Sequence, residues 1–484
     1  SLAALTTAPR LRALQDPQAM ASAALQFRVT LAPGASHRLG WAAPLTGRDE
    51  GLGTSLDLIT LQARFDAAAT AWRERLNRVA LRVPAEAQPL VDTLRSSLAH
   101  MLMSRQGPAL QPGTRSYARS WVRDGAMMVA GLLRLGETDT AREFVQWYAQ
   151  QLFATGKVPC CVDARGADPV AENDSHGQYI YMVAELWRHT RDTKMIDPLW
   201  PGVDAAARYM ELLRQSQRTP AQQRTPFWGL MPASISHEGY SAKPMHSYWD
   251  DFWALAGYRD AARLAQIFAP TARAAELARQ RDEFGNELAA SLAAAVAQHR
   301  IAFLPGAAEL GDFDPSSSTM IFSPAGFEQR VPRALLESTW ERYWREAVAR
   351  RDGRRAWSDY TPYELRSVSA FVRLGQPERA IALLDHFLRD RRPAGWNQWA
   401  EVVGREPREP RFVGDMPHAW ISSDYIRSVL DLLVYERDSD GALVLGAGVP
   451  ATWWRTAPVE VRDLRTAWGT IGWRLQREAP RVLR

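Results

Sequence analysis

The chain has 484 residues, 46% of them apolar and 23% charged, which is the balance of an ordinary globular protein and not of a disordered one. Its net charge of +5 is modest, and its arginines are scattered among acidic residues instead of forming the concentrated basic face that nucleic-acid binding requires. No apolar run approaches the roughly 18–20 residues of a membrane span. We therefore expect neither a nucleic-acid nor a membrane partner.

Cysteine and tryptophan are the residue types whose counts are informative. The only two cysteines, Cys160 and Cys161, are adjacent, so they can neither build a disulfide framework nor supply a four-ligand zinc site. The nine histidines show no H-E-x-x-H pattern, and we predict neither a metal nor a cofactor. The 19 tryptophans suit core packing and also stacking on a sugar ring, because each side chain combines a flat apolar face with one N–H donor.

The N-terminal part of the chain predicts a small β-rich appendage. The sequence begins at Ser1 without a signal-peptide pattern, so we expect a mature or trimmed chain, with a periplasmic or secreted location as the working hypothesis. Residues 24–45 alternate apolar and polar around a Pro-Gly turn, which predicts a β-hairpin. We assign residues 1–56 to a partial β-sandwich or strand appendage and residues 57–85 to a helical linker. The oligomeric state is unknown from sequence.

From about residue 86 the apolar residues recur at helical spacing in one segment after another. Eleven helices are predicted, within 87–105, 124–136, 138–156, 175–192, 197–216, 247–268, 272–299, 333–350, 361–375, 377–390 and 424–437. Tight turns such as "RLGETD" and "RLGQPE" alternate with long loops rich in aromatic residues.

This alternation predicts a mainly α protein whose helical hairpins form an (α/α)6 toroid. Two concentric rings of helices would occupy residues 86–437, and the long loops would gather on one face, where binding residues concentrate. A helical solenoid would show a repeat of fixed period, and the sequence shows none. Residues 438–484 return to alternating strands, which we assign to a C-terminal β cap.

Two of the long loops place charged residues at the start of a predicted helix. "SYARSWVRDGAMM", at 116–128, carries Trp121, Arg123 and Asp124. "VAENDSHGQYIYM", at 170–182, carries Glu172 and Asp174. Helix N-capping by Asp124 or by residues 173–174 is the alternative role, because a side-chain oxygen at that position accepts from the free N–H groups of the first turn.

Two further loops each surround one glutamate with aromatic residues. "GLMPASISHEGYSAKPMHSYWDDFWALAGY", at 229–258, contains Glu238, and residues 392–425 contain Glu401 close to Trp396 and Trp399. Glycosidic cleavage needs such a pair, because one carboxylic acid protonates the leaving oxygen and a second carboxylate activates water or attacks the sugar. An apolar environment raises the pKa of one of them and keeps it protonated near neutrality.

The order of these segments resembles the six-hairpin glycosidases, the (α/α)6-barrel clan of glucoamylases and related α-glucosidases, over about 86–436. "SWVRDGA" is similar to the W-x-R-D element of the clan, and "ENDSHGQYIYMVAELW" is similar to its Q-x-D-x-x-G helix start. "SHEGYSAKPMHSYWDDFWALAGYRDAARLA" lies where the family places its general acid, and "WNQWAEVV" where it places its general base. "MPHAWISSDYIRSVL" resembles the helix start after the base.

The resemblance implies an exo-acting, inverting glycoside hydrolase with Glu238 as general acid and Glu401 as general base. Its substrate would be an oligosaccharide, and we expect release of a terminal sugar, glucose from an α-linked chain in the first place. The expected substrate-binding residues are Trp121, Arg123, Asp124, Glu172, Asp174, His237, Tyr240, Trp249, Asp250, Trp396, Trp399 and His418.

Three rival acids and two rival functions stay open at this point. The family's acid often lies in a W-E stretch, whereas this chain has "HEG", so Asp250, Asp251 and Glu172 compete with Glu238. A disaccharide or oligosaccharide phosphorylase would replace the base by a phosphate site, and the carboxylate of Glu401 would repel phosphate. A non-catalytic glycan-binding protein would keep the tryptophans without needing both glutamates.

Overall fold

The structure, a computed structural model, describes residue 17 and residues 25–43, 57–406, 408–409, 411–479 and 482–483. It divides into two compact units, Ser1–Arg75 and Leu76–Arg484, which are described separately. None of the helices in these described ranges is long and apolar enough to cross a membrane.

In the first unit, the described residues 25–43 form a turn at residues 33–34, where the Ala35 N–H donates to the Ala32 carbonyl at 3.0 Å, but they form no strand. The predicted hairpin is therefore wrong over these residues, and positions 24, 44 and 45 lie outside the described ranges. An isolated two-stranded ribbon is marginal in water because it has no sheet to bury its apolar face. The predicted linker helix is present as α2 (Leu58–Leu76).

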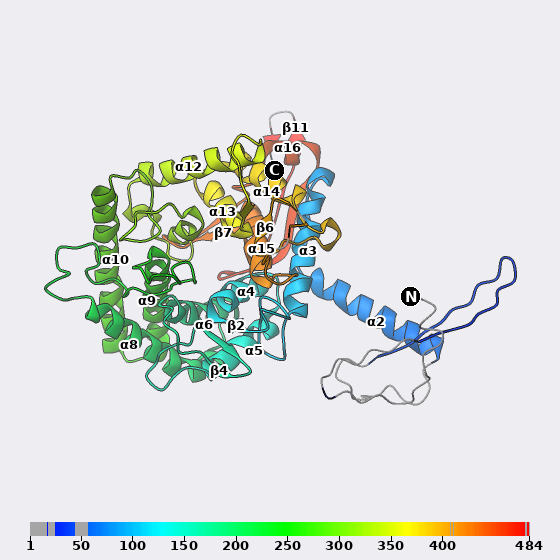
Figure 1. Cartoon of the computed structure of the whole chain (residues 1–484), viewed down its shortest axis with the longest axis horizontal. Coiled ribbons are helices and arrows are strands. Elements are labelled where there is room, and N and C mark those ends of the chain that lie inside the picture. The colour runs from blue at the N-terminus through cyan, green and yellow to red at the C-terminus, as the bar shows by residue number, and fades with distance from the viewer. Residues whose placement is uncertain are drawn as a thin grey trace. The chain divides into compact units, whose positions relative to one another are not determined.

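The second unit contains all eleven predicted helices, arranged as two rings (Figure 1). The inner ring consists of α4 (Val122–Arg134), α6 (Ser175–Thr190), α9 (Tyr248–Phe268), α13 (Arg366–Arg373) and α15 (Ala419–Leu433), completed by the short α11 (Pro315–Ser318) and its 3-10 extension Thr319–Ile321. The outer ring consists of α3 (Gln88–Met103), α5 (Thr138–Ala149), α8 (Trp200–Ser216), α10 (Thr271–His299), α12 (Arg333–Arg351) and α14 (Pro377–Arg389). The (α/α)6 prediction is confirmed.

The inner helices are enclosed because their sequences are apolar around most of the helix circumference. Nearly all side chains of α9 and α15 are buried, including the large rings of Trp249, Trp253 and Tyr425. The α12 helix, in contrast, is rich in arginine and glutamate and buries few residues. The core therefore lies between the two rings and inside the inner one.

The direction of the inner helices determines where loops gather. The helices α4, α6, α9 and α15 all begin after long loops, and the tight turns "RLGETD" and "RLGQPE" follow the C-terminal ends of α4 and α13. The N-terminal ends of the inner helices thus share the face that carries the charged and aromatic loops. Three short elements in these loops are β2 (Ser120–Trp121), β3 (Cys161–Asp163) and β4 (Gly166–Ala167), paired in the order β2-β3-β4.

The remaining strands of the second unit form small antiparallel sheets. β1 (Ala80–Arg82), β9 (Val459–Thr466) and β10 (Gly469–Leu475) form one sheet, in which Leu81 lies opposite Val461. β7 (Val434–Arg437) pairs with β8 (Ala442–Leu445), so residues 434–437, predicted as the end of the last helix, form a strand instead. β5 (Asp359–Tyr360) pairs with β6 (Val403–Gly404), and β11 (Arg477–Ala479) with β12 (Val482–Leu483). Short helices α7 (Thr193–Ile196) and α16 (Ala451–Thr456) complete the element order.

Candidate active site

The loop face holds a pocket into which carboxylates from three distant segments point. Its wall is formed by Pro112, Tyr117, Trp121, Arg123, Asp124, Glu238, Glu401, His418 and Trp420. Six of the predicted site residues are therefore brought together here, both proposed catalytic glutamates among them. Trp121 is held in place because its backbone pairs with Cys161 of β3, directly before α4 begins.

Glu401 accepts hydrogen bonds from two tyrosine hydroxyls. Tyr117 donates to one carboxylate oxygen, Oε2, and Tyr363 donates to the other, Oε1, at 2.8 Å. Burial, followed by the hydrogen bond and charge of Glu401, raises the pKa of Tyr117, so this hydroxyl stays protonated and serves as a donor. Both oxygens of Glu401 are thereby oriented toward fixed donors, which is a suitable arrangement for a carboxylate that must remain in one place.

His418 lies behind Glu401 as a neutral ring. Its Nδ1 donates to the Pro112 carbonyl at 3.3 Å, and its Nε2 lies 3.2 Å from the Tyr363 hydroxyl. Burial lowers the pKa of His418, although the charge of Glu401 opposes that shift. The imidazole therefore lies beside Tyr363 without adding a charge to the pocket.

Glu238 lies on a loop that borders the same pocket and is held from one side. Its Oε1 accepts the indole N–H of Trp121 at 3.0 Å and lies 3.7 Å from Arg123 Nη2. Its side chain is 52% exposed, and its backbone has φ of 64°, in the left-handed region that non-glycine residues rarely occupy. One oxygen of Glu238 is thus held in place, while the rest of its side chain is accessible to solvent.

Arg123 is a buried cation that organises the acidic residues of the site. Its Nη1 donates to Glu172, its Nε lies 3.7 Å from Asp124, and its guanidinium stacks 5.0 Å from the centre of the Trp420 ring. Burial raises the pKa of Asp124 to about 8, with further contributions from the charges of Glu401 and Glu238, while Arg123 opposes the shift. Burial likewise raises the pKa of Glu172 to about 8 against the pull of Arg123.

Several polar atoms of this cluster make no hydrogen bond within the described part of the chain. Asp124 Oδ2, Asp174 Oδ1 and Arg123 Nε are buried without a hydrogen bond to any described residue. Because buried polar atoms are normally hydrogen-bonded, these atoms are suited to hydroxyl groups of a bound molecule. Asp174 is otherwise fixed, since its Oδ2 accepts from Trp249 Nε1 at 2.7 Å and from Gln178 Nε2 at 2.8 Å.

Two of the predicted aspartates lie behind the pocket wall. Asp250 accepts from the hydroxyls of Ser234 and Ser236, and the carboxylate of Asp251 accepts the Met231 N–H. Both aspartates are fully buried, and burial raises the pKa of each. They are placed to hold the loop that carries Glu238, and neither lines the pocket.

The aromatic and histidine neighbours of that loop have similar supporting positions. His237 packs against the Trp249 ring at 5.0 Å, and burial lowers the pKa of His237 to about 4. Tyr240 donates its hydroxyl to Asp312 at 3.1 Å. His237 and Tyr240 therefore support the loop that carries Glu238, and neither lines the pocket.

Trp396 and Trp399 lie away from the pocket. Trp399 is completely buried, and its indole N–H donates to the Phe387 carbonyl at 2.9 Å, which makes it a core residue beneath α14. Trp396 is 50% exposed, and its backbone carbonyl bonds His100 of α3. The proposed role of both residues as pocket walls is instead taken by Tyr117 and Trp420.

Asp415 is a structural residue of the site whose role the sequence does not indicate. Its carboxylate accepts the backbone N–H groups of Arg115, Ser116 and Tyr117 at 2.7, 3.1 and 3.0 Å. Burial opposes its ionisation, but these three donors outweigh burial and lower the pKa of Asp415. The loop can approach this closely because residue 113 is glycine, where a Cβ atom would clash with the carboxylate of Asp415.

Sequence reasoning missed Tyr117 and Tyr363 as functional residues. Tyr117 is within the segment "SYARSWVRDGAMM", shortly before Trp121, so its position in the sequence indicates that it lies beside the site. No sequence feature indicates such a position for Tyr363, because it lies in the 3-10 turn Pro362–Leu365 and reaches Glu401 only through the fold.

Among the described residues, one cluster has metal-type ligands, formed by Cys160, Cys161 and Asp168 behind Trp121. The Asp168 carboxylate already accepts from Arg119 and from the Val170 N–H. The cluster thus offers two buried thiols and an occupied carboxylate, and it lies outside the pocket.

Comparisons with known proteins find similarity at the level of structure. No protein-family model matches the chain, and no curated protein sequence matches it. A GH78 family rhamnosidase of Bacillus sp. GL1 superposes with a TM-score of 0.58 at 13% identity, covering 83% of this chain and 41% of its own. An α-L-rhamnosidase from Dictyoglomus thermophilum gives 0.57 at 10% identity, covering 82% and 43%.

A protein described as a wild-type glycosidase gives a TM-score of 0.51 at 15% identity, covering 72% of this chain and 98% of its own. The chain thus spans less than half the length of the two rhamnosidases and nearly all of the third protein. These similarities establish the class of fold, an (α/α)6 barrel of the kind found in the six-hairpin glycosidases.

Proposed function

We propose that this protein is an exo-acting, inverting glycoside hydrolase that releases a terminal sugar, with Glu238 as general acid and Glu401 as general base. The observation that carries the proposal is that both glutamates line one pocket together with a buried Arg123–Asp124 pair. An inverting enzyme needs two carboxyl groups flanking the scissile bond, with room for a water molecule between the sugar and the base.

Glu401 is suited to the role of base because neutral donors fix the position of its carboxylate. The hydroxyls of Tyr117 and Tyr363 hold its two oxygens, and the neighbouring His418 is neutral. A water molecule placed between Glu401 and the anomeric carbon would lose its proton to the carboxylate as it attacks the sugar. The products of this step are a hemiacetal of inverted configuration and a protonated Glu401.

Glu238 is suited to the role of acid because one of its oxygens is anchored and its other side is open. Trp121 and Arg123 hold Oε1, and the exposed side of the carboxyl group faces the direction from which the rest of the oligosaccharide must extend. Proton transfer to the glycosidic oxygen would then release the remaining chain toward solvent. After each turnover the protons on the two glutamates re-equilibrate with water.

The three rival acids are less well placed. Asp250 and Asp251 are fully buried and hold the Glu238 loop, and Glu172 is paired with Arg123. With a pKa raised to about 8, Asp124 is protonated near neutrality and would donate a hydrogen bond to a sugar hydroxyl. Asp124 lines the pocket and would therefore bind the terminal sugar, whereas Asp174 is fully buried and would support this contact through Arg123 and Trp249.

The sugar itself is the finer part of the proposal. Glucose from an α-linked oligosaccharide is our first candidate, and a variant of the third protein is described in complex with glucose. Rhamnose is the second sugar to test, because two of the similar structures are rhamnosidases. Neither sugar requires a change in the roles of Glu238 and Glu401.

The decisive experiment is proton NMR of the sugar released from α- and β-linked glucosides and α-rhamnosides. The inverted anomer should appear first with the wild type, and Glu238→Gln and Glu401→Gln should each abolish its release. Glu378→Gln, on the outer helix α14, is the matched control and should leave the rate unchanged.

Two other outcomes would overturn the proposal. Turnover that depends on added phosphate and yields a sugar phosphate would identify a phosphorylase. Glycan binding that survives Glu401→Gln, with no turnover of any substrate by the wild type, would identify a binding protein.

A further inference from the structure

A second cavity, of about 640 Å³, lies inside the ring at the end opposite the candidate active site. Its walls are the C-terminal halves of α4, α6, α9 and α15, and it is bordered by the turns at residues 438–441 and 467–468. It shares no wall residue with the pocket of Glu238 and Glu401. Its volume is within the usual range for small-molecule sites.

One corner of this cavity holds three arginines around a single carboxylate. Asp431 accepts from Arg134 Nη1 at 2.9 Å and pairs with Arg373 Nη2 at 3.2 Å. Arg427, one helical turn before Asp431 on α15, donates to the Ser323 carbonyl at 2.6 Å and forms no ion pair with any described residue. Three guanidinium groups thus share one negative charge, which leaves a local excess of positive charge facing the cavity.

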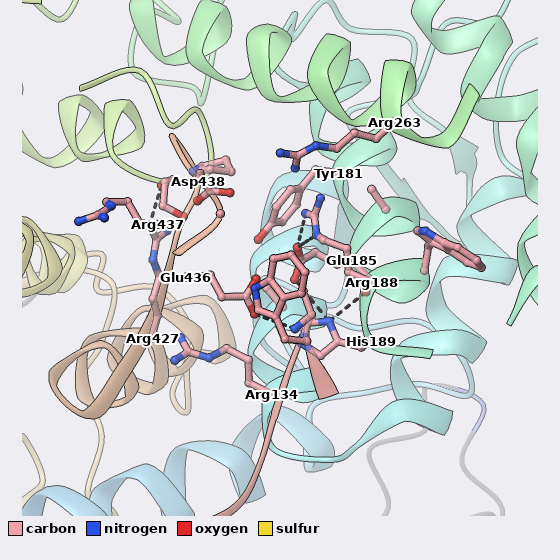
Figure 2. A pocket seen from close by; sticks show the side chains of 18 of the residues that line it. Arg134, Tyr181, Glu185, Arg188, His189, Arg263, Arg427, Glu436, Arg437 and Asp438 are labelled. Atoms are coloured by element: carbon pink, nitrogen blue, oxygen red, sulfur yellow. Dashed lines mark hydrogen bonds and ion pairs between the residues drawn. The ribbon is translucent and has the colours of Figure 1, made fainter. Parts of the chain in front are cut away.

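Carboxylates lie on two sides of the cavity. Figure 2 shows Glu185, Arg188 and His189 of α6 on one side of the cavity and Glu436 on the other. The charges of Arg188 are met by Glu185 and Asp260, so this wall has no cationic excess. Burial, and then the charge of Glu185, raises the pKa of Glu436. Carboxyl groups placed this way accept or donate hydrogen bonds to hydroxyl groups.

The remaining wall supplies aromatic faces and donors without partners. Tyr181 and Trp253 border the cavity with their rings in edge contact at 5.4 Å. The Tyr181 hydroxyl makes no hydrogen bond within the described part of the chain, and Trp253 Nε1 and His189 Nε2 are buried without a partner there. Flat aromatic faces with nearby polar groups are suited to a sugar ring.

From these contacts we infer that the cavity is a second ligand site, which binds a small sugar carrying a phosphate or carboxylate group. The anionic group lies against Arg427, Arg134 and Arg373, the ring lies on Tyr181, and the hydroxyls bond Glu185 and Glu436. A site of this kind is separate from the glycosidase reaction proposed above and does not depend on it.

The site is also connected to the candidate active site through rigid contacts. The ring of Trp253 packs against that of Trp249 at 6.0 Å, and Trp249 donates to Asp174, a buried neighbour of Arg123. A ligand bound between the inner helices would therefore also stabilise the helices that carry the active-site residues. The expected result is a rise in melting temperature when the sugar anion binds.

The test is isothermal titration calorimetry of the full chain with glucose 6-phosphate and glucuronate, compared with glucose, glucosamine and inorganic phosphate. The two sugar anions should bind saturably, and glucose, glucosamine and phosphate should each bind more weakly. Arg427→Gln should weaken the affinity for the sugar anions by about 10- to 100-fold, because a hydrogen bond to a charged group is lost. Arg279→Gln, at an exposed ion pair of α10, is the matched control and should leave the affinity unchanged.

Two further variants separate the possible explanations. Tyr181→Phe removes a hydroxyl that has no partner among the described residues, so it should fold normally and weaken sugar binding several-fold; an unchanged affinity would overturn the site, even if Arg427→Gln fails to fold. Glu401→Gln should leave binding intact, and its loss there would move the ligand to the active-site pocket. Equal affinities for inorganic phosphate and glucose 6-phosphate would overturn the assignment to a sugar.

Discussion

The indole N–H of Trp121 donates to the carboxylate of Glu238 at 3.0 Å, although the two residues are 117 positions apart in the chain. This bond joins the start of α4 to the loop before α9. It holds the inner oxygen of Glu238 while the rest of the side chain is exposed. The proposed acid is therefore positioned mainly by a donor of β2, directly before α4.

Replacing Trp121 by Phe removes that donor and keeps an aromatic ring. We expect kcat to fall on the order of 10-fold, because a hydrogen bond to a charged group contributes about 1.5–3 kcal/mol and only part of it acts in the transition state. Steady-state hydrolysis rates measure this effect. Trp399→Phe is the control: it should lower the free energy of unfolding by about 1–3 kcal/mol, since the Phe387 carbonyl loses its partner, and leave kcat unchanged. Equal kcat losses in both variants would contradict the positioning role of Trp121.

The two tyrosines on Glu401 should be separately important for activity. Tyr117→Phe and Tyr363→Phe each leave one carboxylate oxygen without its donor, so we expect each variant to lower kcat by about 10-fold or more while KM changes less. Tyr360→Phe is the matched control, because it removes a similar bond to Asp390 outside the pocket. Rates of sugar release at saturating substrate test this, and full activity in the double Tyr117→Phe, Tyr363→Phe variant would refute it.

Asp415 should make the stability of the loop at 115–117 dependent on pH. Its pKa is lowered in the folded state by three backbone donors, so its contribution is present above the unfolded value of 3.8 and is lost as the pH falls through the lower folded value. Asp415→Asn should therefore destabilise the protein at pH 7, and the difference from the wild type should shrink at pH 3. Urea unfolding at both pH values measures the difference, and a constant difference would exclude this account.

Asp124 should show the opposite pH dependence. Burial raises its pKa from 3.8 to about 8, so the folded state binds a proton that the unfolded state has already lost between these values. The wild type is thus stabilised by this group below about pH 4 and loses that stability as the pH rises through about 8. The stability of Asp124→Asn relative to the wild type should therefore increase between pH 5 and pH 8.5. Unfolding free energies that shift in the same direction as those of Asp415→Asn would contradict this prediction.

The helices were predictable because their signal is local. Apolar spacing alone located all eleven, and the contrast between tight turns and long aromatic loops correctly indicated which ends share a face. The segment at 434–437 was misassigned because "VYER" continues an apolar helical pattern, whereas its structure is decided by pairing with residues 442–445. A pairing partner in the fold outweighs local periodicity in so short a segment.

The site was only partly predictable because its contacts are distant in the chain. Trp399 has the same sequence signature as a pocket tryptophan, and only the packing under α14 shows it to be core. Tyr363 lies 38 residues from Glu401, and no spacing rule relates them. The second cavity inside the ring could not be predicted from the sequence, because Arg134, Arg373 and Arg427 each resemble an ordinary surface arginine on a helix.

The pairing of β1 with β9 brings residues 80–82, near the start of the second unit, beside residues 460–462, near its end. During synthesis the first strand leaves the ribosome long before its partner exists, so the sheet forms only after the last helices have been made. Because the two ends of the second unit are neighbours in this sheet, a circularly permuted gene that links them and opens the tight turn at 375–376 should retain the helices of both rings.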